Sequence, residues 1–164
     1  MLSKNMLAAL NEQVKHELFS AYLYLSMAAH FEAVNLGGFA KWMRVQAGEE
    51  QEHALKFFDH ILERGGKVAL QAIDQPVVEF GSPIAVFEEV LAHEQKVTAL
   101  IHKLYELAVK ENDYASQLFL GWFVSEQVEE EKNASSIIET LKLVGDRGIA
   151  LHRIDHELGE RKAD

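Results

Sequence analysis

Hydrophobic residues recur along this chain with the spacing of an α-helix, in four long segments that short polar breaks separate. Within each segment they fall near positions i, i+3, i+4 and i+7, which place them on one face of a helix. The predicted helices cover residues 4–34, 39–64, 83–110 and 114–144. No segment alternates residue by residue as a half-buried β-strand would, so we predict an all-α fold.

The breaks between the segments predict how the helices are connected. GG at 65–66 ends the second segment, and Ser82 and Pro83 suit the cap and first turn of the third. The link between them can reach roughly 50 Å, because an extended chain advances about 3.3 Å per residue. This exceeds the roughly 40 Å length of a helix of about 27 residues. The other two links are short, so we predict two antiparallel pairs joined by one long crossover.

The C-terminal end of the chain carries one more helical pattern. GDRG at 145–148 separates it from the fourth segment, and it covers IALHRIDHELGER at 149–161. The predicted architecture is therefore a four-helix bundle with one long crossover and a short fifth C-terminal helix. A length of 164 residues is typical of one domain, so we expect a single domain over residues 1–164.

Each of the four long apolar stripes is interrupted near its middle by an acidic residue. These acids are Glu17, Glu50, Glu94 and Glu130. At about 100° per residue, Gln127 shares the stripe of Glu130, whereas Glu129 points nearly to the opposite side of the helix. Glu94 and Glu130 each lie about 25 Å from the turn that joins their helices, so these two acids are expected at the same depth in the bundle.

His53 adds an imidazole to this acidic layer, because it follows Glu50 by one turn in a Glu-x-x-His pattern. Taken alone, each glutamate is more simply explained as a residue at the edge of the stripe. His53 alone is more simply explained as a core histidine whose hydrogen bonds are satisfied. Four carboxylates together would repel one another and cost several kcal/mol each without a counter-charge. No lysine or arginine occupies the stripes near this layer. A cation is therefore the expected counter-charge, and oxygen ligands with one imidazole favour iron or manganese over copper.

Composition and charge narrow the classes of function. The net charge of -10 argues against nucleic acid and anionic membranes as partners and is compatible with binding cations. The chain has no cysteine, which excludes disulfides, zinc–thiolate sites and iron–sulfur clusters. No apolar run reaches the length of a membrane span, and the N-terminal residues carry charge too early for a signal peptide. We therefore expect a cytoplasmic protein.

Inward glutamates with a Glu-x-x-His pattern resemble the arrangement of ferritin-like di-iron proteins. A narrower resemblance rests on three stretches, AYLYLSMAAHFE, GFAKWMRVQAGEEQEHALKFFDHILERGG and FVSEQVEEE. These stretches resemble the bacterial nonhaem ferritins, a family of ferritin-like di-iron proteins. The resemblance covers essentially the whole chain. It implies iron storage with ferroxidase activity, in which iron(II) is oxidised by dioxygen or hydrogen peroxide and iron(III) is kept as a mineral. It also implies a hollow shell of 24 like subunits, in which the fifth helix packs around symmetry axes through Ile149, Leu151, Ile154 and Leu158.

The resemblance assigns metal-binding and catalytic roles to individual residues. Glu17, Glu50 and His53 match the ligands of one iron in the ferroxidase centre. Glu50 would also bridge to a second iron, which Glu94 and Glu130 would hold.

Other residues match positions around this pair of irons. Gln127 stands where symmetrical di-iron proteins repeat the Glu-x-x-His pattern, and it would tune the centre or form hydrogen bonds to it. Tyr24 matches a tyrosine adjacent to the centre. A third iron site beside the pair, which shares Glu130, matches Glu49, Glu126 and Glu129. Without the resemblance, these three acids would read as a solvated helix face.

Four other families or classes fit the sequence less well. A bacterioferritin would bind haem through a methionine on the second helix. GEEQEHAL contains none and Met43 lies more than a turn too early, so no haem is expected. A rubrerythrin-like peroxidase would normally carry a cysteine-ligated iron domain. A DNA-protecting mini-ferritin places its metal site between subunits and lacks the fifth helix, and a metal-free helical interaction module would leave the core acids unexplained.

Overall fold

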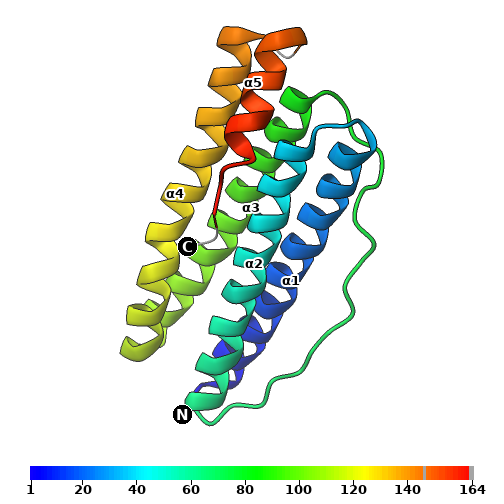
Figure 1. The fold of residues 1–164 in the computed structure, drawn as a ribbon. Helices are drawn as coiled ribbons and strands as arrows, with labels where there is room; N and C mark the ends of the chain where they lie inside the picture. Colours follow the sequence, from blue (N-terminus) through cyan, green and yellow to red (C-terminus); the bar gives the residue numbers. More distant parts are fainter. Residues whose placement is uncertain (146, 163–164) are drawn as a thin grey trace.

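The computed structural model describes residues 1–145 and 147–162 of the chain (Figure 1). In these two ranges it contains helices and connecting segments but no β-strand, which confirms the predicted all-α fold. The helices are α1 (Lys4–Ala33), α2 (Gly37–Glu63), α3 (Pro83–Lys110), α4 (Tyr114–Val144) and α5 (Gly148–Leu158). The ends of the four long helices lie close to their predicted positions.

The four long helices form the predicted bundle. Short turns join α1 to α2 and α3 to α4, and each of these two pairs packs closely side by side (Figure 1). The crossover between α2 and α3 runs along the outside of the bundle from one end to the other. Asn11 of α1 holds its start, because its Nδ2 donates to the carbonyl of Lys67 at 3.2 Å and its Oδ1 accepts from the N–H of Ala69 at 2.7 Å. This arrangement is a four-helix bundle with one long crossover.

Side-chain caps explain where three of the long helices begin. Ser3, Ser82 and Asp113 each accept a hydrogen bond from a backbone N–H in the first turn of the helix that follows. Such caps satisfy N–H groups that have no partner within the helix. The remaining long helix, α2, has no cap from the residue that precedes it.

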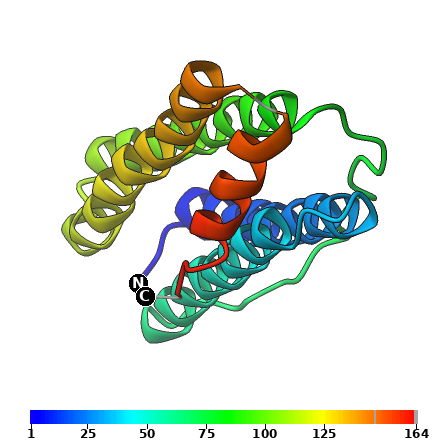
Figure 2. The same ribbon diagram turned by 45° about the horizontal axis from the view of Figure 1, so that its top comes forward.

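The cap of α2 comes instead from α5, which lies across the end of the bundle (Figure 2). Asp155 Oδ1 accepts hydrogen bonds from the N–H groups of Gly38 and Phe39 at 2.7 and 3.0 Å. Gly38 is required for this contact, because a Cβ at that position would lie 1.6 Å from the carbonyl oxygen of Asp155. The fifth helix is therefore held by α2 of its own subunit.

The apolar side chains of α5 pack largely within their own subunit. Ile154 is buried, and Leu151 and Leu158 pack against the core of the same subunit rather than pointing away from it. Only Ile149 of the four apolar residues expected at symmetry axes is widely exposed, at 90%. The helix turns most of its apolar face inward because the end of the bundle would otherwise leave core residues uncovered.

The hydrophobic core consists of two clusters that lie on either side of the acidic layer. One includes Met27, Phe31 and Phe39 at the end covered by α5. The other includes Leu10, Phe57 and Leu120 towards the opposite end. On every long helix the acidic residue falls between the positions that contribute to these two clusters, so the fold brings the four acids to a common layer. No helix in the described part of the chain is both long and apolar enough to cross a membrane.

Candidate metal centre

All four stripe acids lie inside the bundle, as their helical register predicts. Their exposed fractions are 1% for Glu17, Glu50 and Glu94 and 5% for Glu130. Each comes from a different helix. Ionised carboxylates in such positions need partners that offset the loss of hydration.

A first group of potential ligands joins α1 and α2. One ligand atom each from Glu17, Glu50 and His53 lies within 4.8 Å of the others. His53 Nδ1 lies 3.7 Å from Glu50 Oε2. Glu17 Oε1 accepts a hydrogen bond from Gln13 at 2.7 Å, whereas its Oε2 is buried and has no hydrogen-bond partner among the described residues. A buried carboxylate oxygen in this state is suited to bind a cation.

A second group lies on the other side of the same imidazole. His53, Glu126 and Glu130 offer ligand atoms within 4.8 Å of one another, and His53 Nε2 lies 3.9 Å from Glu126 Oε1. Because His53 belongs to both groups, the two candidate cation positions are adjacent. The sequence resemblance assigns Glu126 to the third site, but its side chain also lies beside the pair.

Glu94 falls outside both groups and is held by hydrogen bonds instead. The hydroxyl of Tyr24 donates to Glu94 Oε1, and Gln127 Nε2 donates to Glu94 Oε2 at 3.1 Å. Tyr24 is fully buried. The structure thus places both Tyr24 and Gln127 next to the acidic centre, where the resemblance expects them, with Glu94 as the residue that they contact.

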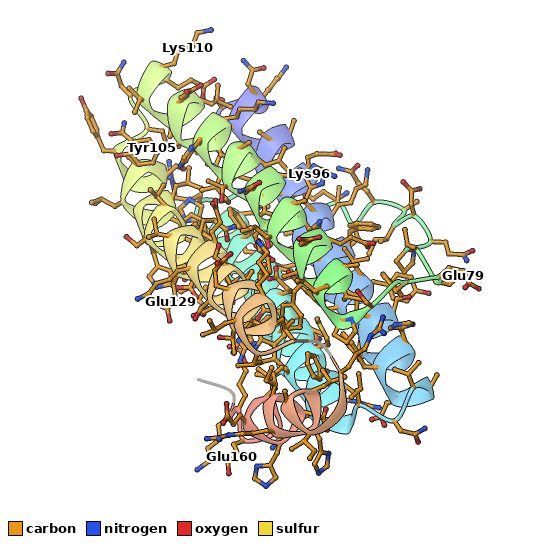
Figure 3. The ribbon with its side chains drawn as sticks, turned by 90° about the horizontal axis from the view of Figure 1, so that it is seen from above. Glu79, Lys96, Tyr105, Lys110, Glu129 and Glu160 are labelled. Carbon is orange, nitrogen blue, oxygen red and sulfur yellow. The ribbon has the colours of Figure 1, made fainter. Side chains whose placement is uncertain are left out.

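The residues predicted for a third site are more exposed than the stripe acids, and of the three only Glu126 belongs to one of the two groups of potential ligands. Glu49 and Glu126 are half-buried, and Glu129 is exposed on the side of α4 that faces away from the other helices (Figure 3). Gln127 and Glu130 are buried. The predicted division of EQVEEE into an inward and an outward face is therefore confirmed, while the metal-binding role of the outward acids remains a prediction.

Two glutamines at the centre were not predicted from the sequence. Gln13 donates to Glu17, and Gln46 Nε2 donates to Glu130 Oε2 at 2.8 Å and to Glu50 Oε1 at 3.3 Å. Each glutamine precedes the acid of its own helix by four residues, so the two share one helix face. This spacing could have revealed them, because a buried amide one turn before a buried acid is an available donor.

Aromatic side chains close the centre around His53. The rings of Trp122 and Phe123 approach the imidazole edge-on, with centroids 5.5 and 5.7 Å away. The sequence marked Phe123 as core but gave no signal for Trp122, which is 42% exposed. These contacts restrict the orientation of His53 and keep both of its nitrogens directed at acidic residues.

Burial changes the electrostatics of the acids. Desolvation, followed by the neighbouring Glu50 carboxylate, raises the pKa of Glu17 well above its ordinary value, and burial with Glu94 nearby does the same for Glu50. Burial also raises the pKa of Glu94, although Tyr24 and Gln127 donate hydrogen bonds to it. The pKa of Glu130 is raised to about 8 by burial and by Glu94. Without a metal ion these shifts favour the protonated form of the acids, and a bound divalent cation would replace those protons.

The metal-free protein is expected to lose stability as the pH rises from about 4.5 to about 8. An unfolded glutamate releases its proton near pH 4.5, whereas folded Glu130 holds its proton up to about pH 8. The folded state therefore binds more protons in this interval, and its free energy of unfolding decreases with rising pH. Urea midpoints measured in chelator at several pH values should fall, and the fall should be smaller in Glu130→Gln. Equal slopes in the two proteins would contradict the assignment.

The fold and the site together define a class of protein: a helical bundle whose buried carboxylates and single imidazole form groups that could hold a metal ion. Comparison with known proteins identifies the family within this class. The chain belongs to the ferritin family, because the family described as "Ferritin-like domain" matches residues 7–144.

Individual relatives cover the whole chain. It is 44% identical to a bacterial non-heme ferritin of Bacteroides fragilis, over 98% of this chain and 100% of the relative. A bacterial non-heme ferritin of Staphylococcus aureus is 41% identical over 100% of this chain and 99% of its own. Among solved structures, an open pore ferritin of Archaeoglobus fulgidus is 50% identical with a TM-score of 0.97, over 99% and 100% of the two chains. A closed form of Archaeoglobus fulgidus ferritin, engineered by mutagenesis, is 49% identical with a TM-score of 0.98 and full coverage of both chains.

Proposed function

We propose that this protein stores iron, oxidising iron(II) at a dinuclear centre and keeping the iron(III) as a mineral inside a hollow shell of like subunits. The observation that carries the proposal is the layer of four buried acids, one from each long helix, around one imidazole. The ferritin names of the full-length relatives support it. Iron is the substrate and cargo of this activity, and dioxygen is the proposed oxidant, with hydrogen peroxide as the alternative.

The proposed oxidation uses the first group of ligands together with Glu94 and Glu130 from the facing helices. Glu17, Glu50 and His53 would bind one iron(II), and Glu50 would bridge to a second iron(II) held by Glu94 and Glu130. Two iron(II) ions supply two electrons, the number that reduces dioxygen to the level of hydrogen peroxide. The carboxylates favour the iron(III) product because hard oxygen ligands stabilise the higher charge.

Other residues of the same layer would support this chemistry by orienting the ligands. Gln127 and Tyr24 orient Glu94 through their hydrogen bonds. Gln46 does the same for Glu50 and Glu130. Charge-assisted hydrogen bonds of this kind fix the direction of a ligand oxygen and its basicity.

A third iron site would receive iron at the edge of the pair. Its ligands would be Glu49, Glu126 and Glu129, with Glu130 shared. The half-buried position of Glu126 beside His53 and Glu130 suits a carboxylate that serves both the pair and its neighbour. Glu129 extends this set towards the outside of the bundle.

Assembly into a shell is supported by apolar side chains that the subunit leaves exposed. Tyr22, Leu25 and Val78 are 50%, 49% and 61% exposed, and they line one groove between α1 and the crossover. A second copy of this chain would cover them. We propose a shell of 24 subunits. Because the Archaeoglobus fulgidus ferritin has both an open pore form and an engineered closed form, whether this shell has open pores is a separate property to measure.

The function is tested by loading the purified protein with aerobic iron(II) and measuring its mass by light scattering during gel filtration. We expect a large homo-oligomer that co-elutes with many iron atoms per subunit. Glu50→Ala serves as the control, since the same shell should form but load iron slowly. A protein that stays monomeric or dimeric over a range of salt concentrations would refute the shell, and iron that elutes apart from the protein would refute storage.

A further inference from the structure

The segment that follows α5 brings a positive charge to the acidic centre. The α5 cap on α2 sets the direction of this segment, and Lys41 Nζ donates to the carbonyl of Gly159 at 2.6 Å. From there the chain runs down along the bundle rather than away from it (Figure 1). Arg161 is therefore delivered to a position beside α2 near the level of the metal ligands.

The guanidinium of Arg161 makes three contacts with α2. Its Nη2 donates to Glu49 Oε2 at 2.5 Å, and its Nη1 donates to Gln46 Oε1 at 2.8 Å. The guanidinium carbon also lies 4.4 Å from the centre of the Trp42 ring. The side chains of Arg161 and Glu49 are only 19% and 16% exposed. This ion pair is largely shielded from solvent, and hydrogen bonding and cation–π attraction act together in it.

The same contacts connect Arg161 to the dinuclear centre. The side-chain oxygen of Gln46, Oε1, accepts from Arg161. The Nε2 of the same amide is therefore directed at Glu130 and Glu50. Glu49 also acts on the centre directly, since its negative charge contributes to raising the pKa of Glu130. Only the side-chain amide of Gln46 therefore lies between Arg161 and the proposed iron ligands Glu50 and Glu130.

We propose that Arg161 is the resident counter-cation of Glu49 and that a metal ion in the third site displaces it, which releases the C-terminal segment from α2. This inference rests on the third site proposed above. Glu49 Oε2 binds the guanidinium in this structure, so a metal ion that takes this oxygen must compete with Arg161 for it. The stripes of the long helices carry no basic residue near this layer, and the tail supplies the charge from outside them.

Competition has a defined consequence for affinity. Breaking a partly buried ion pair opposes binding of the third metal, whereas the first two metals do not use Glu49. Arg161→Ala should therefore strengthen binding of the third metal about three- to tenfold, while the first two, which do not use Glu49, stay tightly bound. Arg161→Lys retains the charge and should stay nearer to the wild type, and Arg153→Ala removes an exposed arginine of α5 as a matched control.

The affinity test uses zinc(II), a redox-inert divalent probe, titrated into the metal-free protein by calorimetry. The expected result is two tight sites per subunit in every variant and a third site that is tighter in Arg161→Ala alone. An equal or weaker third site in Arg161→Ala would overturn the competition. A third zinc absent from both proteins would overturn the third site and this inference together, while the two tight sites would keep the dinuclear centre.

The release of the segment has its own readout in Trp42, on which Arg161 lies. The chain has two tryptophans, so Trp122→Phe leaves Trp42 as the only one. In that background, the third zinc should shift the emission of Trp42 to longer wavelength, because the departing side chain exposes the ring to water. The same shift should already be present in Arg161→Ala without zinc. Emission that stays constant while the third zinc binds would overturn the displacement.

Discussion

Glu50→Ala is expected to remove the fast phase of iron(II) oxidation and lower its rate by about 100-fold or more. Glu50 is the acid that the rest of the centre surrounds: it belongs to the group with Glu17 and His53 and accepts a hydrogen bond from Gln46. As the proposed bridge it serves both irons, so its loss affects both. Alanine leaves a small cavity but also removes one buried acid, and these two effects on stability oppose each other.

The measurement is stopped-flow absorbance after mixing metal-free protein with two iron(II) per subunit in the presence of dioxygen. Glu52→Ala is the matched control, because Glu52 lies two residues further along α2 but is exposed. It should oxidise iron at the wild-type rate. A wild-type rate in Glu50→Ala as well would remove Glu50 from the site and with it the proposed bridge.

The second large effect is expected on the rate of iron(II) oxidation, and it should differ between substitutions on the inward and outward faces of EQVEEE. Glu130→Ala should slow the first fast phase strongly, because Glu130 is buried and lies within ligand distance of His53 and Glu126. Glu129→Ala should leave this phase almost unchanged, because Glu129 is exposed and points away from the pair. The double change Glu126→Ala and Glu129→Ala should lose the third metal while the two others remain bound.

Anomalous diffraction from crystals soaked in iron or zinc shows the occupied positions directly. Two metals in the double variant and three in the wild type would agree with a third site. Three metals in both would mean that Glu126 and Glu129 form only a solvated helix face. The position of Glu126 beside His53 adds one expectation, namely a moderate slowing of the fast phase in the double variant that Glu129→Ala alone lacks.

The helical architecture and the inward direction of the four acids follow from local patterns. A helix repeats about every 3.6 residues, so a register assigned on apolar residues also assigns the acids between them. This is why the sequence predicts Gln127 and Glu130 as buried and Glu129 as exposed. Polar caps such as Ser82 and Asp113 likewise act within one turn, so the helix starts could be predicted closely.

The family resemblance added what periodicity could not. Register directs Glu17 and Glu94 into the bundle but does not say which metal each would bind. Their assignment came from matching stretches of sequence. The geometry supports the group of Glu17, Glu50 and His53. It also brings Glu126 to His53, although the sequence match assigns Glu126 to the third site only.

Contacts between segments far apart in the chain were decided by tertiary structure alone. Asp155 caps α2 from more than a hundred positions away, and Arg161 reaches Glu49 only because that cap sets the course of the last residues. No local pattern in the last residues of the chain indicates a partner on α2, since an exposed arginine near a terminus is ordinary. The sequence by itself determined the helices, their inward acids and the need for a counter-charge, because these depend on period and burial. The tertiary structure decided which acids share His53 and which one binds Arg161, because those pairings depend on how separate helices pack.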